Sequence, residues 1–128
     1  MKAQSDFYRL IEEIYGRDNR YKPDAYEFVM QALHFTQKKL KRRGHVQGSE
    51  LLEGIRGFVI DQYGPMSKTV LHHWGITSTQ DFGNIVFNMI EQKILSARDE
   101  DSLDDFKDIY DFDEAFGHLF RDIPLTIE

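Results

Sequence analysis

The chain has no cysteine among its 128 residues and only three prolines. The missing cysteine excludes disulfide bonds, thiolate metal sites and cysteine nucleophiles. The opening residues, Met-Lys-Ala-Gln-Ser-Asp-Phe-Tyr, lack the apolar run of a secretory leader, and no apolar stretch approaches membrane-spanning length. These absences predict a cytoplasmic protein that makes no contact with a membrane.

The composition is typical of a globular domain. Hydrophobic residues make up 41% of the chain and charged residues 30%, and ten Phe, six Tyr and one Trp can supply a core. A chain of 128 residues has the size of one domain. We therefore expect a single domain over residues 1–128, with mobile tails at 1–5 and 122–128 and an acidic loop at 97–105.

Charge is distributed unevenly along the chain, whose formal net charge is −6. Residues 1–64 carry 11 Lys and Arg against 9 Asp and Glu, whereas residues 65–128 carry 5 against 13. The two halves therefore have opposite sign, and each is suited to a partner of complementary charge.

Apolar residues recur at intervals of three to four in five segments, a pattern typical of amphipathic helices. The predicted helices cover about residues 6–15, 23–43, 49–63, 66–74 and 78–95. Gly54 and Gly57 lie inside the third, where each glycine costs about 1 kcal/mol relative to alanine. We expect that these glycines allow a close backbone contact with another helix, or with a ligand.

Beyond Leu95 the pattern permits two structures. Leu103, Phe106 and Tyr110 fit one face of a helix, whereas residues 94–97 and 109–112 fit two short strands joined by the acidic loop. A last helical turn follows Asp113, and residues 125–127 can add an edge strand. The sequence thus predicts a mainly α domain with a helix-turn-helix-like pair at 65–95, which a small C-terminal β-hairpin would make winged-helix-like.

Four segments carry a resemblance to known sequences. They are residues 45–56 (His-Val-Gln-Gly-Ser-Glu-Leu-Leu-Glu-Gly-Ile-Arg), Tyr63-Gly64-Pro65, Trp74-Gly75-Ile76 running into residues 81–87, and residues 110–116. Together they resemble a small uncharacterised bacterial family of planctomycete and verrucomicrobial type. The resemblance covers about residues 20–120 and implies a bacterial cytoplasmic protein of unknown function, without assigning catalytic or binding residues.

The predicted pair at 65–95 has the layout of a DNA-reading helix-turn-helix. Its second helix would offer base edges the side chains of Thr79, Gln80, Asn84, Asn88 and Gln92. DNA binding also needs cations against the phosphates, yet only Lys68 and Lys93 are basic in this segment, and the acidic loop follows it. We therefore expect a structural helix pair here, with nucleic acid disfavoured as its ligand.

A basic cluster closes the second predicted helix. It consists of Lys38, Lys39, Lys41, Arg42 and Arg43. If the following loop folds back, these cations and His45 would lie near free backbone N–H groups at the next helix start, where Ser49 is the expected cap. That would be an anion-binding or partner-binding site. The simpler interpretation, which we favour, is that the cations complement the negative helix end and remain in water.

The matching acidic docking segment contains Asp99, Asp101, Asp104 and Asp105. It fits no calcium loop, because no register places Gly at the sixth position after acids or Asn at the first, third and fifth. His72 and His73 are adjacent on a helix and cannot chelate one metal unaided, and the pair Glu114 and His118 lacks a third ligand. The sequence predicts no metal, no cofactor and no catalytic residue.

These observations favour a cytoplasmic, non-enzymatic interaction module that docks a protein partner or a second copy of itself through its basic and acidic surfaces. One alternative is a nucleic-acid-binding or nucleic-acid-associated protein that uses the basic residues of 38–43. Another is an enzyme acting on a small anionic substrate, which would need a concave pocket near residues 44–50.

Overall fold

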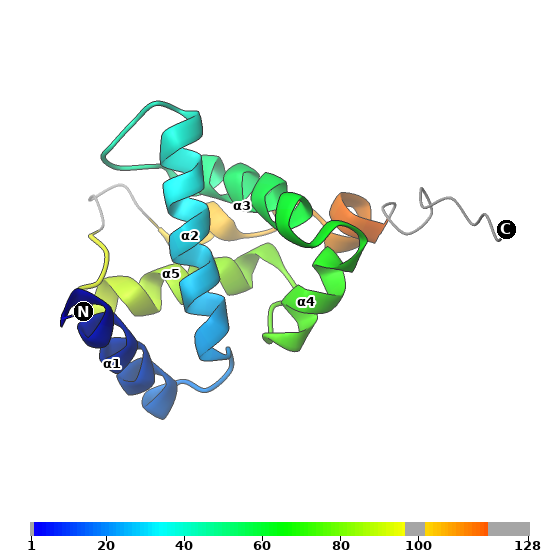
Figure 1. The fold of residues 1–128 in the computed structure, drawn as a ribbon. Coiled ribbons are helices and arrows are strands. Elements are labelled where there is room, and N and C mark those ends of the chain that lie inside the picture. The colour runs from blue at the N-terminus through cyan, green and yellow to red at the C-terminus, as the bar shows by residue number, and fades with distance from the viewer. Residues whose placement is uncertain (1, 97–101, 118–128) are drawn as a thin grey trace, which may run out of the picture.

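The computed structural model describes residues 2–96 and 102–117 (Figure 1). The α-helices in these residues are α1 (Lys2–Arg17), α2 (Pro23–Lys39), α3 (Gly48–Tyr63), α4 (Ser67–His73) and α5 (Thr79–Glu91). Three short helical turns complete the described chain: η1 (Gly64–Met66), η2 (Leu103–Phe106) and η3 (Asp113–Gly117). The predicted mainly α fold is confirmed. No helix in this part of the chain combines the length and the apolar character that crossing a membrane requires.

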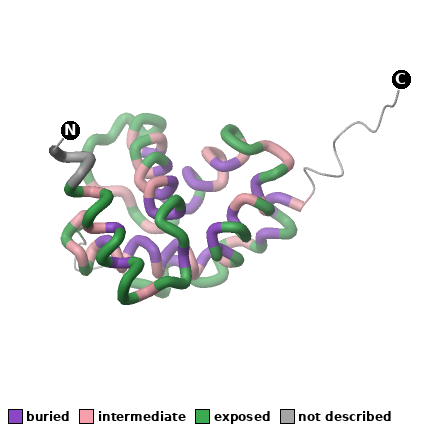
Figure 2. The backbone as a smooth tube through the Cα atoms, turned by 60° about the horizontal axis from the view of Figure 1, so that its bottom comes forward, coloured by how far each residue is buried: buried purple, intermediate pink, exposed green. Residues whose placement is uncertain are grey.

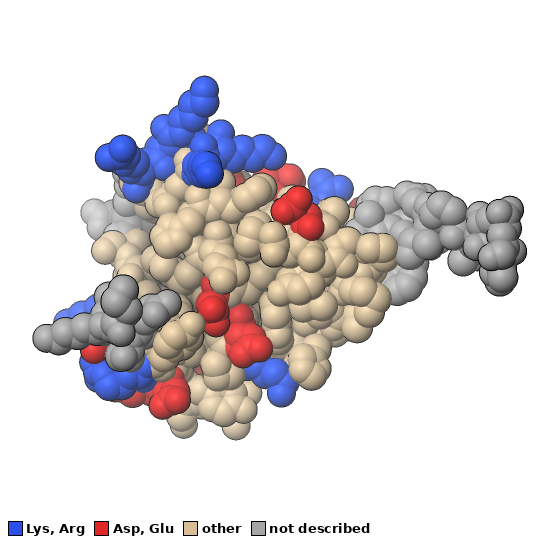
Figure 3. All heavy atoms as spheres, in the orientation of Figure 1, with Lys and Arg blue, Asp and Glu red and all other residues tan. Residues whose placement is uncertain are grey.

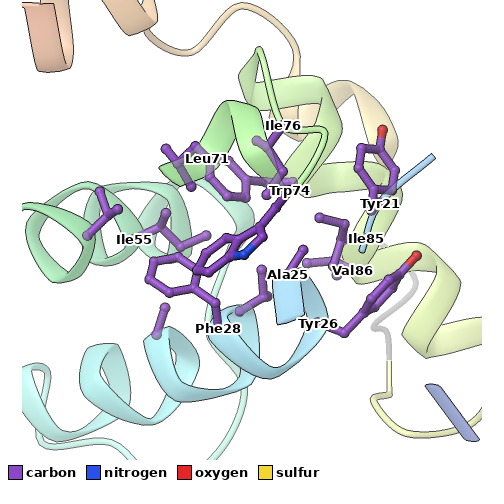
Figure 4. Close-up of a cluster of buried hydrophobic side chains, with 14 of the residues drawn as sticks. Tyr21, Ala25, Tyr26, Phe28, Ile55, Leu71, Trp74, Ile76, Ile85 and Val86 are labelled. Atoms are coloured by element: carbon purple, nitrogen blue, oxygen red, sulfur yellow. The ribbon is translucent and has the colours of Figure 1, made fainter. Parts of the chain in front are cut away.

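The core lies where α2, α3 and α5 meet the turn after α4 (Figure 4). Trp74 packs against Phe28, with 5.2 Å between their ring centroids. Ile55, Ile76 and Ile85 have no exposed surface, and full burial of such a side chain contributes about 1.5–3 kcal/mol. Along every helix the buried positions turn inward and the exposed ones outward (Figure 2), as the three-to-four-residue spacing predicts.

Helices α2 and α3 are in close contact at Gly54. A Cβ atom at this position would lie 1.7 Å from Oγ1 of the buried Thr36. The Thr36 hydroxyl itself donates a hydrogen bond of 2.7 Å to the carbonyl oxygen of Ala32. The predicted close helix contact is therefore confirmed at Gly54. At Gly57 the nearest atom to such a Cβ is Phe35 Cε2 at 3.9 Å, so that glycine is not required by packing.

The turn between α4 and α5 meets the loop between α1 and α2. Gly75 has a φ of +93°, and a Cβ there would lie 2.2 Å from the carbonyl oxygen of Arg20. In the same contact the N–H of Lys22 donates to the carbonyl of Trp74 at 3.1 Å. Only glycine combines this backbone conformation with so close an approach. The helix pair thus occurs where it was predicted, with its turn fixed against an earlier part of the chain.

The predicted winged-helix-like hairpin is wrong for the residues that the structure describes, because none of them forms a strand. Residues 109–112 run between η2 and η3 and are bonded to α5 and α3. The N–H of Ile109 donates to Thr79 Oγ1 at 3.2 Å, and the Tyr110 hydroxyl donates to the carbonyl of Leu52 at 2.9 Å. Residue 97 of the first predicted strand and the edge strand at 125–127 lie outside the described residues.

Candidate functional site

The basic cluster lies at the C-terminal end of α2, where blue side chains gather at the top of Figure 3. The helix ends at Lys39, earlier than predicted, because Lys41 adopts a φ of +55° and the N–H of Arg42 bonds back to the carbonyl of Gln37 at 2.8 Å. The Gln37 amide then donates to the carbonyl of Gly44 at 2.9 Å. The cations at 41–43 therefore lie on a loop that is tied to α2.

The predicted meeting of cations with the next helix start does occur, but a carboxylate of the protein occupies it. Arg42 donates to both oxygens of Glu50, at 2.8 and 3.0 Å, and the N–H of Gln47 donates to the same carboxylate at 2.9 Å. The Arg42 guanidinium, followed by that backbone N–H, lowers the pKa of Glu50. Gln47, and not the expected Ser49, is the cap of α3, and Ser49 is exposed in the first turn.

The other four cations of the cluster, Lys38, Lys39, Lys41 and Arg43, are exposed. Within residues 2–96 and 102–117 none of them forms an ion pair, in contrast to Arg42. We call these four residues the free basic cluster. The chain as a whole has a net charge of −6, whereas these four exposed residues form a positively charged patch. Such a patch attracts anionic groups.

A pocket of about 310 Å³ lies beside this cluster, between α2, α3, α5, η2 and the loop at 44–48. Its apolar lining consists of Leu33, Val46, Leu51, Val86, Phe87, Ile90, Leu95 and Phe106. The polar lining comes from Gln37, His45, Ser96 and Asp105, of which Ser96 and Asp105 are exposed at the edge. Among residues 2–96 and 102–117, no lysine or arginine lines the pocket. The concave feature that the enzyme alternative requires near residues 44–50 is thus present, although its lining is mainly apolar.

Two glycines allow η2 to form one wall of this pocket. A Cβ at Gly83 of α5 would lie 2.8 Å from Phe106 Cβ, and one at Gly48 would lie 3.1 Å from Asp105 Cβ. Phe106 is therefore seated between the start of α3 and the middle of α5, with 4% of its surface exposed. Sequence reasoning missed this wall. The available signal was Gly83, because a glycine inside an otherwise strong helix usually has a packing reason.

The acidic docking segment lies only partly within the described residues. Asp99 and Asp101 fall outside them. Asp104 and Asp105 are exposed and belong to η2, whose first turn they close: the N–H of Asp104 donates to Ser102 Oγ at 3.1 Å, and Asp105 accepts from the N–H of Ser102 at 3.0 Å. Asp105 also reaches the edge of the pocket. The structure therefore brings one predicted acidic residue to the pocket that Gly44 and His45 also line.

The polar face of α5 is bonded to the protein itself and does not face solvent as a DNA-reading surface. Asn84 donates to the Tyr21 hydroxyl at 2.9 Å, and Asn88 donates to Asp18 at 2.8 Å and to the Tyr26 hydroxyl at 3.0 Å. Gln92 at the C-terminal end of α5 donates to Glu13 at 2.8 Å, Gln80 in its first turn donates to Asp108 at 3.4 Å, and Thr79 is buried. The face predicted to offer base contacts instead bonds α5 to other parts of the domain.

Charged hydrogen bonds strengthen the contact between the α1–α2 loop and α5. Asp18 accepts two bonds from the Arg20 side chain, at 2.9 and 2.7 Å. This guanidinium, together with the Asn88 amide, holds the pKa of the Asp18 carboxyl well below its usual range. The Tyr21 hydroxyl donates to Asp81 at 2.5 Å, and burial, more than this carboxylate, raises the pKa of Tyr21. These groups are structural ties between the α1–α2 loop and α5.

In the part of the chain that the structure describes, no group of three or more His, Asp or Glu side chains is arranged to hold a metal ion. His72 and His73 are both exposed on α4. Comparison of the chain with protein-family models, with curated proteins and with solved structures gave no match. The resemblance to a bacterial family therefore stays a prediction.

Proposed function

We propose that this chain is a non-enzymatic interaction module that docks an acidic segment of a partner protein on the free basic cluster. The observation that carries the proposal is the solvated state of Lys38, Lys39, Lys41 and Arg43 beside a loop that Gln37 and the Arg42–Glu50 pair hold in place. A fixed backbone reduces the ordering that binding requires. Complementary charge also speeds encounter with an acidic partner.

Nucleic acid is the second candidate for the same cations. Strong binding to a duplex depends on neutralising many phosphates, and the free basic cluster supplies four cations on a chain of net charge −6. The amides of α5 that were expected to reach bases are bonded to Tyr21, Asp18 and Glu13. An acidic protein segment, which carries fewer charges at lower density, suits the cluster better.

The enzyme alternative has its pocket, but the character of the lining favours another use. Among the described residues eight lining side chains are apolar, and Arg42, which reaches the start of α3, is bound to Glu50. An apolar lining stabilises an apolar group and leaves a small anion without its hydration. We therefore assign the pocket to binding and not to chemistry on an anionic substrate.

The test compares binding of two labelled probes by fluorescence anisotropy: a 12-residue peptide of alternating Glu and Ser, and a 20-base-pair DNA duplex. We expect the peptide to bind saturably at low salt and more weakly at about 150 mM salt, where the screening length is about 8 Å. The triple variant Lys38→Gln/Lys39→Gln/Lys41→Gln should lose at least tenfold in affinity for it.

A matched control removes the same charge elsewhere. Lys22, Lys93 and Lys107 are exposed and lie outside the cluster, so Lys22→Gln/Lys93→Gln/Lys107→Gln should bind the peptide as the unaltered chain does. Equal losses in both triple variants would show that only net charge matters and would overturn the proposal. Tighter binding of the duplex than of the peptide at about 150 mM salt would assign the cluster to nucleic acid instead.

A further inference from the structure

The pocket beside the free basic cluster has the features of a binding site for one bulky apolar group. Its apolar lining includes the buried side chains of Leu51, Val86 and Phe106 and half-buried ones such as Val46 and Ile90. The volume of about 310 Å³ lies at the lower end of the range of ligand pockets, about 300–1,000 Å³. A site of this size is suited to a single large side chain rather than to a whole helix.

Some residues that line the pocket are neighbours of the cations in the sequence. Gln37 and Gly44, which both contribute to the lining, directly flank the segment that carries the free basic cluster. A residue of an extended peptide spans at most about 3.6 Å, so residues a few positions from a buried anchor can reach the segment 38–43. Apolar burial and charge pairing are therefore available to one short segment at the same time.

We infer that this pocket binds an aromatic or branched aliphatic side chain of the same acidic partner segment, so that the module recognises a bulky apolar anchor flanked by carboxylates. This inference rests on the proposed function and specifies its partner. Hot spots of protein interfaces typically consist of one large side chain in a desolvated pocket, with charged pairs around it. Burial of the anchor adds affinity that exposed ion pairs, which are individually weak, do not supply.

Asp105 should make binding depend on the direction in which the partner segment crosses the pocket. Its exposed side chain lies on the η2 side of the pocket, beside Gly48 at the start of α3. A carboxylate of the partner on that side would meet a like charge, which disfavours binding. The partner segment should therefore carry its acids on one side of the anchor only. Peptides with the acids before or after the anchor should differ in affinity, and Asp105→Asn should reduce this difference.

The test uses four labelled ten-residue peptides and the full chain. One contains three Glu residues followed by a Trp, one has the order reversed, one has Ser in place of Trp, and one has Gln in place of Glu. Two of these peptides contain both Glu and Trp, in opposite orders. We expect one of these two to bind at least tenfold more tightly than the peptide without Trp. The peptide without Glu should bind more weakly than that preferred peptide.

The pocket is then filled by substitution. Val46→Trp places a large side chain on the loop wall, and it should abolish the advantage that the Trp anchor gives. Gly44→Trp is a second variant, because a Cβ at this exposed glycine meets nothing within 4 Å. Val70→Trp, at a half-buried position outside the lining, is the control and should keep the advantage. Thermal unfolding establishes that each variant is folded.

The outcomes separate the two proposals. If acidic peptides bind but the anchor adds nothing in either order, the pocket inference is overturned and the proposed function stands. If no acidic peptide binds at any salt concentration, the proposed function fails as well. If the peptide without Glu binds as tightly as the preferred peptide, the site takes apolar groups irrespective of charge, which also overturns the inference.

Discussion

Gly54 and Gly57 lie one turn apart on α3, and the same substitution should have opposite effects at the two positions. Replacing a helix-interior glycine by alanine gains about 1 kcal/mol of helix propensity. At Gly54 the added methyl would lie 1.7 Å from Thr36 Oγ1 and 2.8 Å from Thr36 Cβ. Overpacking of this kind costs about 1–3 kcal/mol, and displacement of Thr36 also sacrifices its bond to Ala32, about 1 kcal/mol.

We therefore expect Gly54→Ala to lower the free energy of unfolding by about 1–3 kcal/mol. Gly57→Ala, whose methyl would meet only Phe35 at 3.9 Å, should raise it by about 0.5–1 kcal/mol. The difference of about 1.5–4 kcal/mol between the two variants does not depend on the unfolded chain, because the same residue types are exchanged in the same helix.

Urea unfolding, followed by the fluorescence of the single tryptophan Trp74, measures both values. Thr36→Ala provides the coupling test: in a double-mutant cycle, part of the loss caused by Gly54→Ala should disappear, because the nearest atom has been removed. A Gly54→Ala variant as stable as Gly57→Ala would refute the close crossing of α2 and α3.

Three further substitutions test other contacts. Asp18→Asn removes a carboxylate whose pKa Arg20 holds below its usual range. A carboxylate with a lowered pKa stabilises the fold when the pH is above its pKa in the unfolded chain. This stabilisation is lost as the pH falls through the pKa of the folded state. The variant should be about 1–2 kcal/mol less stable at neutral pH, and its stability should fall less steeply in acid. Urea titrations at several pH values measure this, and an unchanged dependence of the free energy of unfolding on pH would contradict it. Tyr21→Phe removes the hydroxyl that bonds the α1–α2 loop to Asp81 and Asn84 of α5 and should cost about 1–2 kcal/mol in thermal unfolding; unaltered stability would mean that water replaces these bonds. Phe106→Ala leaves a cavity between α3 and α5 and should cost about 3–5 kcal/mol by calorimetry, whereas a loss below about 1 kcal/mol would show that η2 is not part of the core.

The helices were predictable because their signals are local. The Ser78-x-x-Asp81 pattern marks the start of α5, and in the structure Asp81 accepts the N–H of Ser78 at 3.1 Å, as in a capping box. The close crossing at Gly54 was also predictable in kind, because a glycine inside a helix needs a reason. Its partner Thr36 was not, because nothing in the spacing along one helix identifies the atom that faces it on another.

The features that could not be predicted from the sequence depend on contacts between segments far apart in the chain. Asn84 and Asn88 look like an exposed polar face, but they bond to Tyr21 and Asp18, 63 and 70 residues earlier in the chain. In the same way Arg42 resembled a free cation until the fold placed Glu50 against it. A periodic pattern distinguishes apolar from polar faces, whereas it does not tell whether a polar face meets water or another polar segment.

The seating of Phe106 between Gly48 and Gly83 has a consequence for the rates of hydrogen exchange. Residues 102–112 contain only the short turn η2, and side chains hold this segment to α3 and α5. Such segments open at lower free energy than the helices that they cover. Phe106 also forms a wall of the pocket, so an open segment has no complete pocket. A group bound there must therefore slow amide exchange across residues 102–112, including amides that it never touches.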